Sequence, residues 1–273
     1  MRTLCCCLLV LLCTTADAHP GIGIVEDSRG NIFYTDLTHV WRIDPEGRRT
    51  IAVRNVHTHE LSIDASDALY GEHLWYNGEA RNTWGHFVWK RHTDGRIDTV
   101  IRAREGFRTD YSFVRDDSGT MYWVERGTKE RIMKRTTAGA VTPVHPSRFS
   151  GVGWLYATPN GTLYIRDRNT LHRCDPDGTL RMIARVSPHT DYGLLHGLWS
   201  DRRGNIYLED GKQRQVTMVD PHGSVSVFMR SDKGWAPSGG VFAADGTLWL
   251  LEYSPQNRVR VRRIATDGKI RIF

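Results

Sequence analysis

Cysteine is nearly missing from this 273-residue chain once its first 13 residues are set aside. Four of the five cysteines lie in that leading segment: Cys5, Cys6, Cys7 and Cys13. Only Cys174 remains, so the body of the chain has no internal disulfide to hold it together. Cys174 lies in the alternating stretch Leu171 to Asp175, and we expect a half-buried strand thiol rather than a nucleophile, since only His172 nearby could activate it.

Long apolar runs are missing as well. The run from Leu4 to Leu12 is too short to span a bilayer, and no later stretch approaches the roughly 20 apolar residues that a membrane helix needs. A positive charge at Arg2 before the run and a small-x-small site at Ala16 to Ala18 after it are typical of a cleaved signal peptide. We therefore expect residues 1–18 to be removed, and residues 19–273 to be secreted or periplasmic with no membrane span.

A large excess of one charge is also lacking. The chain has 37 Lys and Arg against 31 Asp and Glu, a net charge of +6, which is modest for this length and, with export, gives no reason to expect nucleic acid as a partner. Arg258, Arg260 and Arg262 alternate with valines, which places them on one face of a strand. We expect a solvated outer face there, with an anion-binding patch as the alternative. A phosphate-binding glycine loop is missing, because the glycines of residues 21–30 open a strand rather than a helix.

What the chain does have is a glycine-containing turn that returns six times. The closing glycines are 48, 44, 39, 45 and 45 residues apart: Gly47, Gly95, Gly139, Gly178, Gly223 and Gly268. A period of this size, with short strands and tight turns between, is typical of a propeller in which each repeat is one blade. Repeats that need a neighbour to bury their faces favour one closed domain.

The first repeat supplies the template for a blade. Residues 23–26, 32–34, 39–43 and 49–53 are short apolar or β-branched segments separated by turns. We therefore predict an all-β chain, a six-bladed β-propeller with four antiparallel strands per blade, over residues 19–273 after the signal peptide. Each blade is expected to come from one continuous segment, with no strand shared at ring closure. The short glycine turns then share one face, and we expect function among the longer loops of the opposite face, at the mouth of the central channel.

This pattern resembles the NHL-repeat family of six-bladed propellers and, more loosely, the senescence-marker and gluconolactonase-like group. The resemblance rests on GIVEDSRGNIFYTD and VWRIDPEGR in the first repeat and on GLWSDRRGNIYLED and VTMVDPHG in the fifth. It implies the fold but no single activity, because such propellers host unrelated functions. The acidic motif that opens the first blade of the gluconolactonase-like group is replaced here by His19-Pro20-Gly21, which weakens a lactonase function.

Two histidines occupy matched positions at the starts of innermost strands. In the six aligned repeats these positions are Ile22, His59, Tyr111, Gly153, His196 and Ser238. The second and fifth blades of a six-fold ring are opposite, so the imidazoles of His59 and His196 are expected to face each other across the channel. His57 would share their side if its stretch is extended. Imidazoles with a carboxylate suit a divalent ion, zinc or calcium. The peptidylglycine amidating lyases, which hold zinc with channel histidines, resemble this outline, and the resemblance carries over to His59 and His196 only.

Two classes of function follow. In the first, the protein is a metal-assisted lyase or hydrolase acting on a small polar molecule. There Asp110 or Glu60 completes the metal shell or acts as a base, and Tyr111 is an acid or an orienting group. The same residues binding a ligand without metal, and a purely structural role for the histidines, remain open alternatives.

In the second class, the protein is a monomeric, non-catalytic recognition module that binds a glycan, peptide or protein on the same face. Its contacts would come from His73, Trp84, Tyr192 and Trp235. His73 stands where the other five second strands end in an acid, and those acids are expected to cap loops: Asp36, Glu125, Asp167, Asp210 and Glu252.

Overall fold

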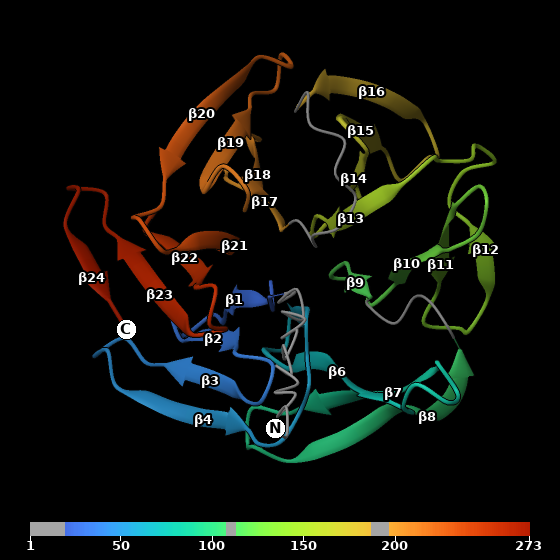
Figure 1. Ribbon diagram of the computed structural model, residues 1–273, viewed down its shortest axis with the longest axis horizontal. Coiled ribbons are helices and arrows are strands. Elements are labelled where there is room, and N and C mark those ends of the chain that lie inside the picture. The colour runs from blue at the N-terminus through green and yellow to red at the C-terminus, as the bar shows by residue number, and fades with distance from the viewer. Residues whose placement is uncertain (1–19, 108–112, 187–196) are drawn as a thin grey trace, which may run out of the picture.

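The computed structural model of the protein describes residues 20–107, 113–186 and 197–273. Its described residues form 24 β-strands in six four-stranded antiparallel sheets, and the sheets are arranged as the blades of a ring (Figure 1). The predicted six-bladed β-propeller is therefore confirmed. None of the described residues forms a helix that is long and apolar enough to cross a membrane.

Each blade uses four consecutive strands. Blade 1 has β1 (Ile24–Glu26), β2 (Ile32–Thr35), β3 (Val40–Ile43) and β4 (Arg49–Val53); blade 2 has β5 (Leu61–Ile63), β6 (Leu69–Tyr76), β7 (Trp84–Arg91) and β8 (Ile97–Phe107). Blade 3 has β9 (Val114–Arg115), β10 (Met121–Glu125), β11 (Arg131–Arg135) and β12 (Val141–Pro143); blade 4 has β13 (Val152–Ala157), β14 (Leu163–Asp167), β15 (Thr170–Cys174) and β16 (Leu180–Arg185). Blade 5 has β17 (Leu198–Ser200), β18 (Ile206–Asp210), β19 (Gln215–Val219) and β20 (Val225–Arg230); blade 6 has β21 (Ala236–Phe242), β22 (Leu248–Tyr253), β23 (Val259–Ile264) and β24 (Ile270–Ile272).

The turn between the first and second strands is built from an aspartate and a glycine. In blade 1 the Asp27 carboxylate accepts the N–H groups of Arg29 and Asn31, and Gly30 takes a φ of 77°, a conformation that glycine adopts without steric cost. Because every blade is antiparallel, these turns and the turns between the third and fourth strands lie on one face of the ring, as the sequence predicts.

The innermost strands approach one another closely where they carry glycine. A Cβ at Gly239 of blade 6 would lie 2.0 Å from the Ile22 carbonyl oxygen of blade 1, and a Cβ at Gly23 would lie 2.6 Å from the Leu61 nitrogen of blade 2. The Ile22 and Gly23 N–H groups both donate to the His59 carbonyl. The ring therefore closes by direct packing of blade 6 on blade 1, without a shared strand (Figure 1).

Three of the five acids that end the second strands cap loops as the sequence predicts. Asp36 accepts the N–H groups of Thr38 and His39, Asp167 accepts those of Ser150 and Gly151, and Asp210 accepts that of Gln213. The prediction is wrong for Glu125, which pairs with Arg131, and for Glu252, which pairs with two arginines of β23.

Two features of the strands differ from the sequence-based expectation. Cys174 is buried, at 1% exposure, rather than half-buried, because it packs in the apolar cluster between blades 3 and 4. The solvated face expected for Arg258, Arg260 and Arg262 is confirmed for Arg258, which is exposed, and is wrong for the other two, which lie in β23. Arg260 and Arg262 bind the buried Glu252 carboxylate and Asp232, an exposed residue of the connection between blades 5 and 6.

Candidate functional site

A cavity of about 260 Å³ lies within the ring and is lined by residues from all six blades. Most of its lining is apolar, and its charged residues are Glu26, Glu60, Arg115 and Asp117. Glu60 immediately precedes β5, whereas Glu26 ends β1 and Asp117 lies in a glycine turn. The lining thus extends from the starts of the innermost strands, on the face where the sequence predicts the site, to the face of the glycine turns.

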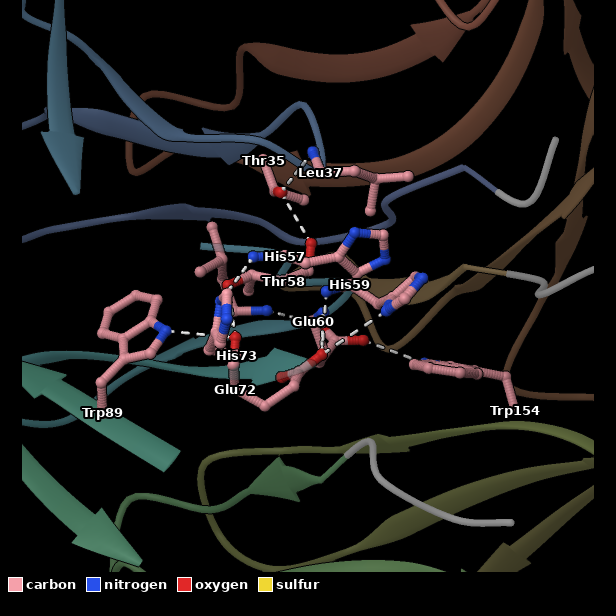
Figure 2. A network of polar contacts seen from close by, with 11 residues as sticks. Thr35, Leu37, His57, Thr58, His59, Glu60, Glu72, His73, Trp89 and Trp154 are labelled. Carbon is pink, nitrogen blue, oxygen red and sulfur yellow. Dashed lines mark hydrogen bonds and ion pairs between the residues drawn. The ribbon is translucent and has the colours of Figure 1, made fainter. Parts of the chain in front are cut away.

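Glu60 is held by donors from its own blade and from blade 4. The Trp154 indole Nε1 donates to Glu60 Oε2 over 3.0 Å, and the Leu61 N–H donates to Oε1 over 3.3 Å. Figure 2 shows the indole of Trp154 reaching toward the carboxyl group across the space between the two blades. Trp154 is itself buried in β13, so the position of its N–H is fixed by packing.

Glu72 lies behind Glu60, and only 2% of it is exposed. Its Oε1 accepts the backbone N–H of His59 at 2.8 Å and of Glu60 at 3.3 Å (Figure 2). The imidazole Nδ1 of His59 is 3.9 Å from the same oxygen. Glu72 therefore fixes the backbone from which the Glu60 side chain projects.

Both carboxyl groups hold their protons more tightly than glutamate in water. Burial, followed by the nearby charge of Glu72, raises the pKa of Glu60 to about 8, although the bonds from Leu61 and Trp154 lower it in part. Burial raises the pKa of Glu72 to about 7, against the lowering effect of the His59 and Glu60 N–H groups. At neutral pH Glu60 is thus mainly a neutral carboxylic acid, a group that can donate a proton.

The histidines of this region are close together. The rings of His57 and His59 have centroids 4.8 Å apart and meet edge to face. The His57 N–H donates to His73 Nδ1 over 3.0 Å, so that nitrogen is an acceptor and His73 carries its proton on Nε2 when neutral. Burial lowers the pKa of His73, in keeping with a neutral ring. His59 is fully buried, and the residue that lines the cavity is its neighbour Glu60.

The remaining sequence-predicted residues do not gather at this cavity. Trp84 packs on Tyr76 in the β6–β7 hairpin, with ring centroids 5.0 Å apart, and Trp235 lies under the Arg260 guanidinium at 4.3 Å. Neither tryptophan lines the cavity. Four predicted site residues lie outside the described residues: Asp110, Tyr111, Tyr192 and His196.

The structure leaves the predicted metal site without a complete set of ligands. Within residues 20–107, 113–186 and 197–273, no group of three His, Cys, Asp or Glu side chains could hold a metal ion. A zinc or calcium ion bound by His57 and His59 would therefore need further ligands from residues 108–112 or 187–196. The metal therefore remains a prediction.

Sequence reasoning missed the roles of Glu72 and Trp154. One signal for Glu72 was present, because the fourth residue of the second strand is polar in four blades although these strands are otherwise apolar. Those residues are Thr35, Glu72, Arg166 and Glu209, all buried. The contact of Trp154 with Glu60 joins residues 94 positions apart, and no local pattern predicts it.

No family model matches the chain, and no curated protein matches it. Solved structures share its fold. A virginiamycin B lyase from Staphylococcus aureus is 13% identical, with 95% of this chain and 85% of that chain covered and a TM-score of 0.58. A gluconolactonase from Xanthomonas campestris is 13% identical, with 88% and 84% covered and a TM-score of 0.63. An auxiliary nutrient binding protein from Bacteroides ovatus is 13% identical, with 94% and 70% covered and a TM-score of 0.63. The chain therefore has the six-bladed fold of gluconolactonase-like and virginiamycin B lyase-like propellers, while membership of the NHL-repeat family stays a prediction.

The raised pKa of Glu60 predicts how the free energy of unfolding depends on pH. The pKa of Glu60 is raised from 4.5 to about 8 on folding, so its contribution to the free energy of unfolding is full below pH 4.5 and decreases as the pH rises to about 8. Glu72 acts in the same direction up to a pH of about 7. Urea unfolding at several pH values should show a decline across this range that is shallower in Glu60→Gln. The exposed Glu79→Gln is the matched control and should keep the wild-type slope. Identical slopes for all three proteins would contradict the raised pKa.

Proposed function

We propose that the protein is an exported hydrolase or lyase that acts on a small polar molecule in the central cavity, with Glu60 as its proton donor. The observation that carries this proposal is a carboxyl group that lines the cavity and has a pKa raised to about 8 by burial. A group that remains protonated at neutral pH and can lose its proton is suited to general acid catalysis.

The surrounding residues supply what such a step requires. When Glu60 gives its proton to a leaving oxygen or nitrogen of the substrate, the carboxylate that remains keeps the donors Trp154 Nε1 and Leu61 N–H. Both bonds favour the charged form and limit the cost of forming it in a buried place. Glu72 acts as a positioning residue through the backbone of residues 59 and 60. In a hydrolase, water adds to the cleaved bond and reprotonates Glu60; in a lyase, the proton returns from the substrate carbon.

The comparisons are compatible with this class of reaction. Gluconolactonase and virginiamycin B lyase are enzymes with this fold, but the nutrient binding protein shows that the fold also serves ligand binding. The argument for catalysis in this chain therefore comes from Glu60 and its environment, and not from the fold.

Activity on a panel of small esters and lactones, with each substrate incubated without protein as the baseline, would test the proposal. Glu60→Gln is expected to lose 100-fold or more of the activity toward any panel member that the wild type cleaves, in line with roughly 10²–10⁴-fold for general acid catalysis. Glu79→Gln should retain full activity.

Trp154→Phe adds a readout that a merely structural role would not change. The indole N–H lowers the pKa of Glu60, so its removal should raise that pKa and shift the alkaline limb of the pH–rate profile to higher pH. Elemental analysis of the same preparation, purified without chelator or nickel resin, would show whether a metal accompanies the activity. Full activity of Glu60→Gln would overturn the proposal and favour the recognition module.

A further inference from the structure

One cation, Arg115, lies in the described lining of the central cavity, at the end near the glycine turns. Its guanidinium lies over the Tyr70 ring, 4.4 Å from the centroid, and Nη2 is 3.1 Å from Met121 Sδ. The residue also lines a second cavity of about 330 Å³ that includes residues of blades 2 and 3. Arg115 therefore lines both cavities and is positioned by its ring contact with Tyr70 and by the bond that Nη2 donates to Met121. Within the described residues its Nε–H and Nη1–H groups remain available to a ligand.

The other buried arginines show how unusual Arg115 is in this chain. Arg260 and Arg262 are paired with Glu252, and Arg126 with Glu130. Arg166 instead donates to the backbone carbonyl groups of Arg168 and Glu209, whereas the side chain of Arg115 contacts an aromatic ring and a thioether. Arg115 is part-buried, enough that desolvation lowers its pKa, and within the described residues no carboxylate lies in ion-pair contact with it. A guanidinium cannot lose its proton in a protein, so this cation is held in the wall without a bound counter-charge.

The carboxylates in the neighbourhood are already engaged. Asp64 accepts the Ala68 N–H and the Tyr70 hydroxyl, and Lys90 lies 3.3 Å from it. Asp116 accepts bonds from three partners of its own turn and blade: Ser118, Thr120 and Tyr122. These acids cap turns and attract Arg115 at longer range only.

The other two charged residues near this end of the cavity are acids. Glu26 accepts the Ala244 N–H, and Asp117 is exposed. Two acids disfavour the entry of strongly anionic molecules. A ligand with one carboxylate can form a bidentate contact with the guanidinium, and this contact offsets the repulsion from the two acids. A second negative charge on the ligand would find no further cation in the described lining of the cavity.

We propose that Arg115 binds a carboxylate of the ligand, so that the cavity takes a small monocarboxylic acid whose hydrocarbon part lies against the apolar walls. Residues Ile24, Ile63, Leu155 and Val241 supply those walls. The inference deepens the proposed function, because it rests on Glu60 and Arg115 sharing one cavity and names the substrate class for that site.

Binding of two matched probes tests this inference without any turnover. Butanoate and butanamide have the same shape and differ in charge. Titration followed by NMR chemical shifts should give the wild type at least a tenfold lower Kd for butanoate than for butanamide. Arg115→Gln should remove this preference, and Arg115→Lys should keep part of it, because a lysine retains the charge without the planar fork. Arg102→Gln, at an exposed arginine of β8, should leave the preference unchanged.

Each outcome decides for or against the carboxylate site. Equal affinity of the wild type for both probes would overturn it, and so would a preference that survives in Arg115→Gln or that falls equally in Arg102→Gln. If Arg115→Gln does not fold, the wild-type comparison and Arg115→Lys still decide. Glu60→Gln should still bind butanoate, so a failure of the catalytic proposal would leave this test intact.

Discussion

Gly239→Ala is expected to lower the free energy of unfolding by about 3 kcal/mol or more. The added Cβ would lie 2.0 Å from the Ile22 carbonyl oxygen and 3.0 Å from its carbonyl carbon. Overpacking of a well-packed interior commonly costs about 1–3 kcal/mol, and this clash falls at the upper end because a backbone carbonyl cannot rotate away as a side chain can. Relief requires blades 6 and 1 to separate where the ring closes.

Gly127→Ala provides the matched control for this substitution. The nearest atom to a Cβ at position 127 is the Lys129 carbonyl oxygen, at 3.8 Å, which is ordinary van der Waals contact. Urea unfolding followed by tryptophan fluorescence should show a large fall in the midpoint for Gly239→Ala and little change for Gly127→Ala. Equal midpoints would mean that the innermost strands can move apart at no great cost, and that ring closure does not depend on this contact.

The fold was predictable from the sequence because its determinants are local and repeated. A positive-φ glycine such as Gly30 and a turn-capping acid such as Asp27 act within a few residues of each other, and the same pair returns in blade 3 and in blade 5 as Asp116 with Gly119 and Asp201 with Gly204. Strand alternation also placed Arg260 and Arg262 on one face correctly. Their burial was not predictable, because Asp232, which covers them, is 28 and 30 residues away in the chain.

The candidate site was predictable only in part. Alignment of the repeats drew attention to positions 57–60 at the start of an innermost strand, and Glu60 was among the expected acids or bases. Its high pKa arises from burial and from Glu72, which belongs to the next strand, while its hydrogen-bond donor Trp154 comes from blade 4. The chemistry of Glu60 therefore depends on contacts between strands and blades, which the period of the repeat does not specify.

Glu252→Gln is expected to destabilise the protein by about 3–5 kcal/mol, since removal of one partner leaves buried charge uncompensated. The Glu252 carboxylate is fully buried and binds Arg260 Nε at 2.7 Å, Arg262 Nε at 3.1 Å and Arg262 Nη2 at 3.0 Å. Asp232 also binds both arginines but is 58% exposed, so water screens its charge and it can replace little of the loss.

Asp267→Asn is the control, because Asp267 pairs with Lys269 at 2.8 Å on the surface, where water screens both charges and the pair contributes little to stability. In the double variant Glu252→Gln/Arg262→Met, removal of one unpaired cation should restore part of the lost stability, and a double-mutant cycle measures that coupling. An equal cost for Glu252→Gln and Asp267→Asn would show that water reaches the two arginines. Arg260 and Arg262 would then be more hydrated than their positions between blades 5 and 6 imply. The ion pairs of Asp232 with these two arginines would contribute little to holding the two blades together.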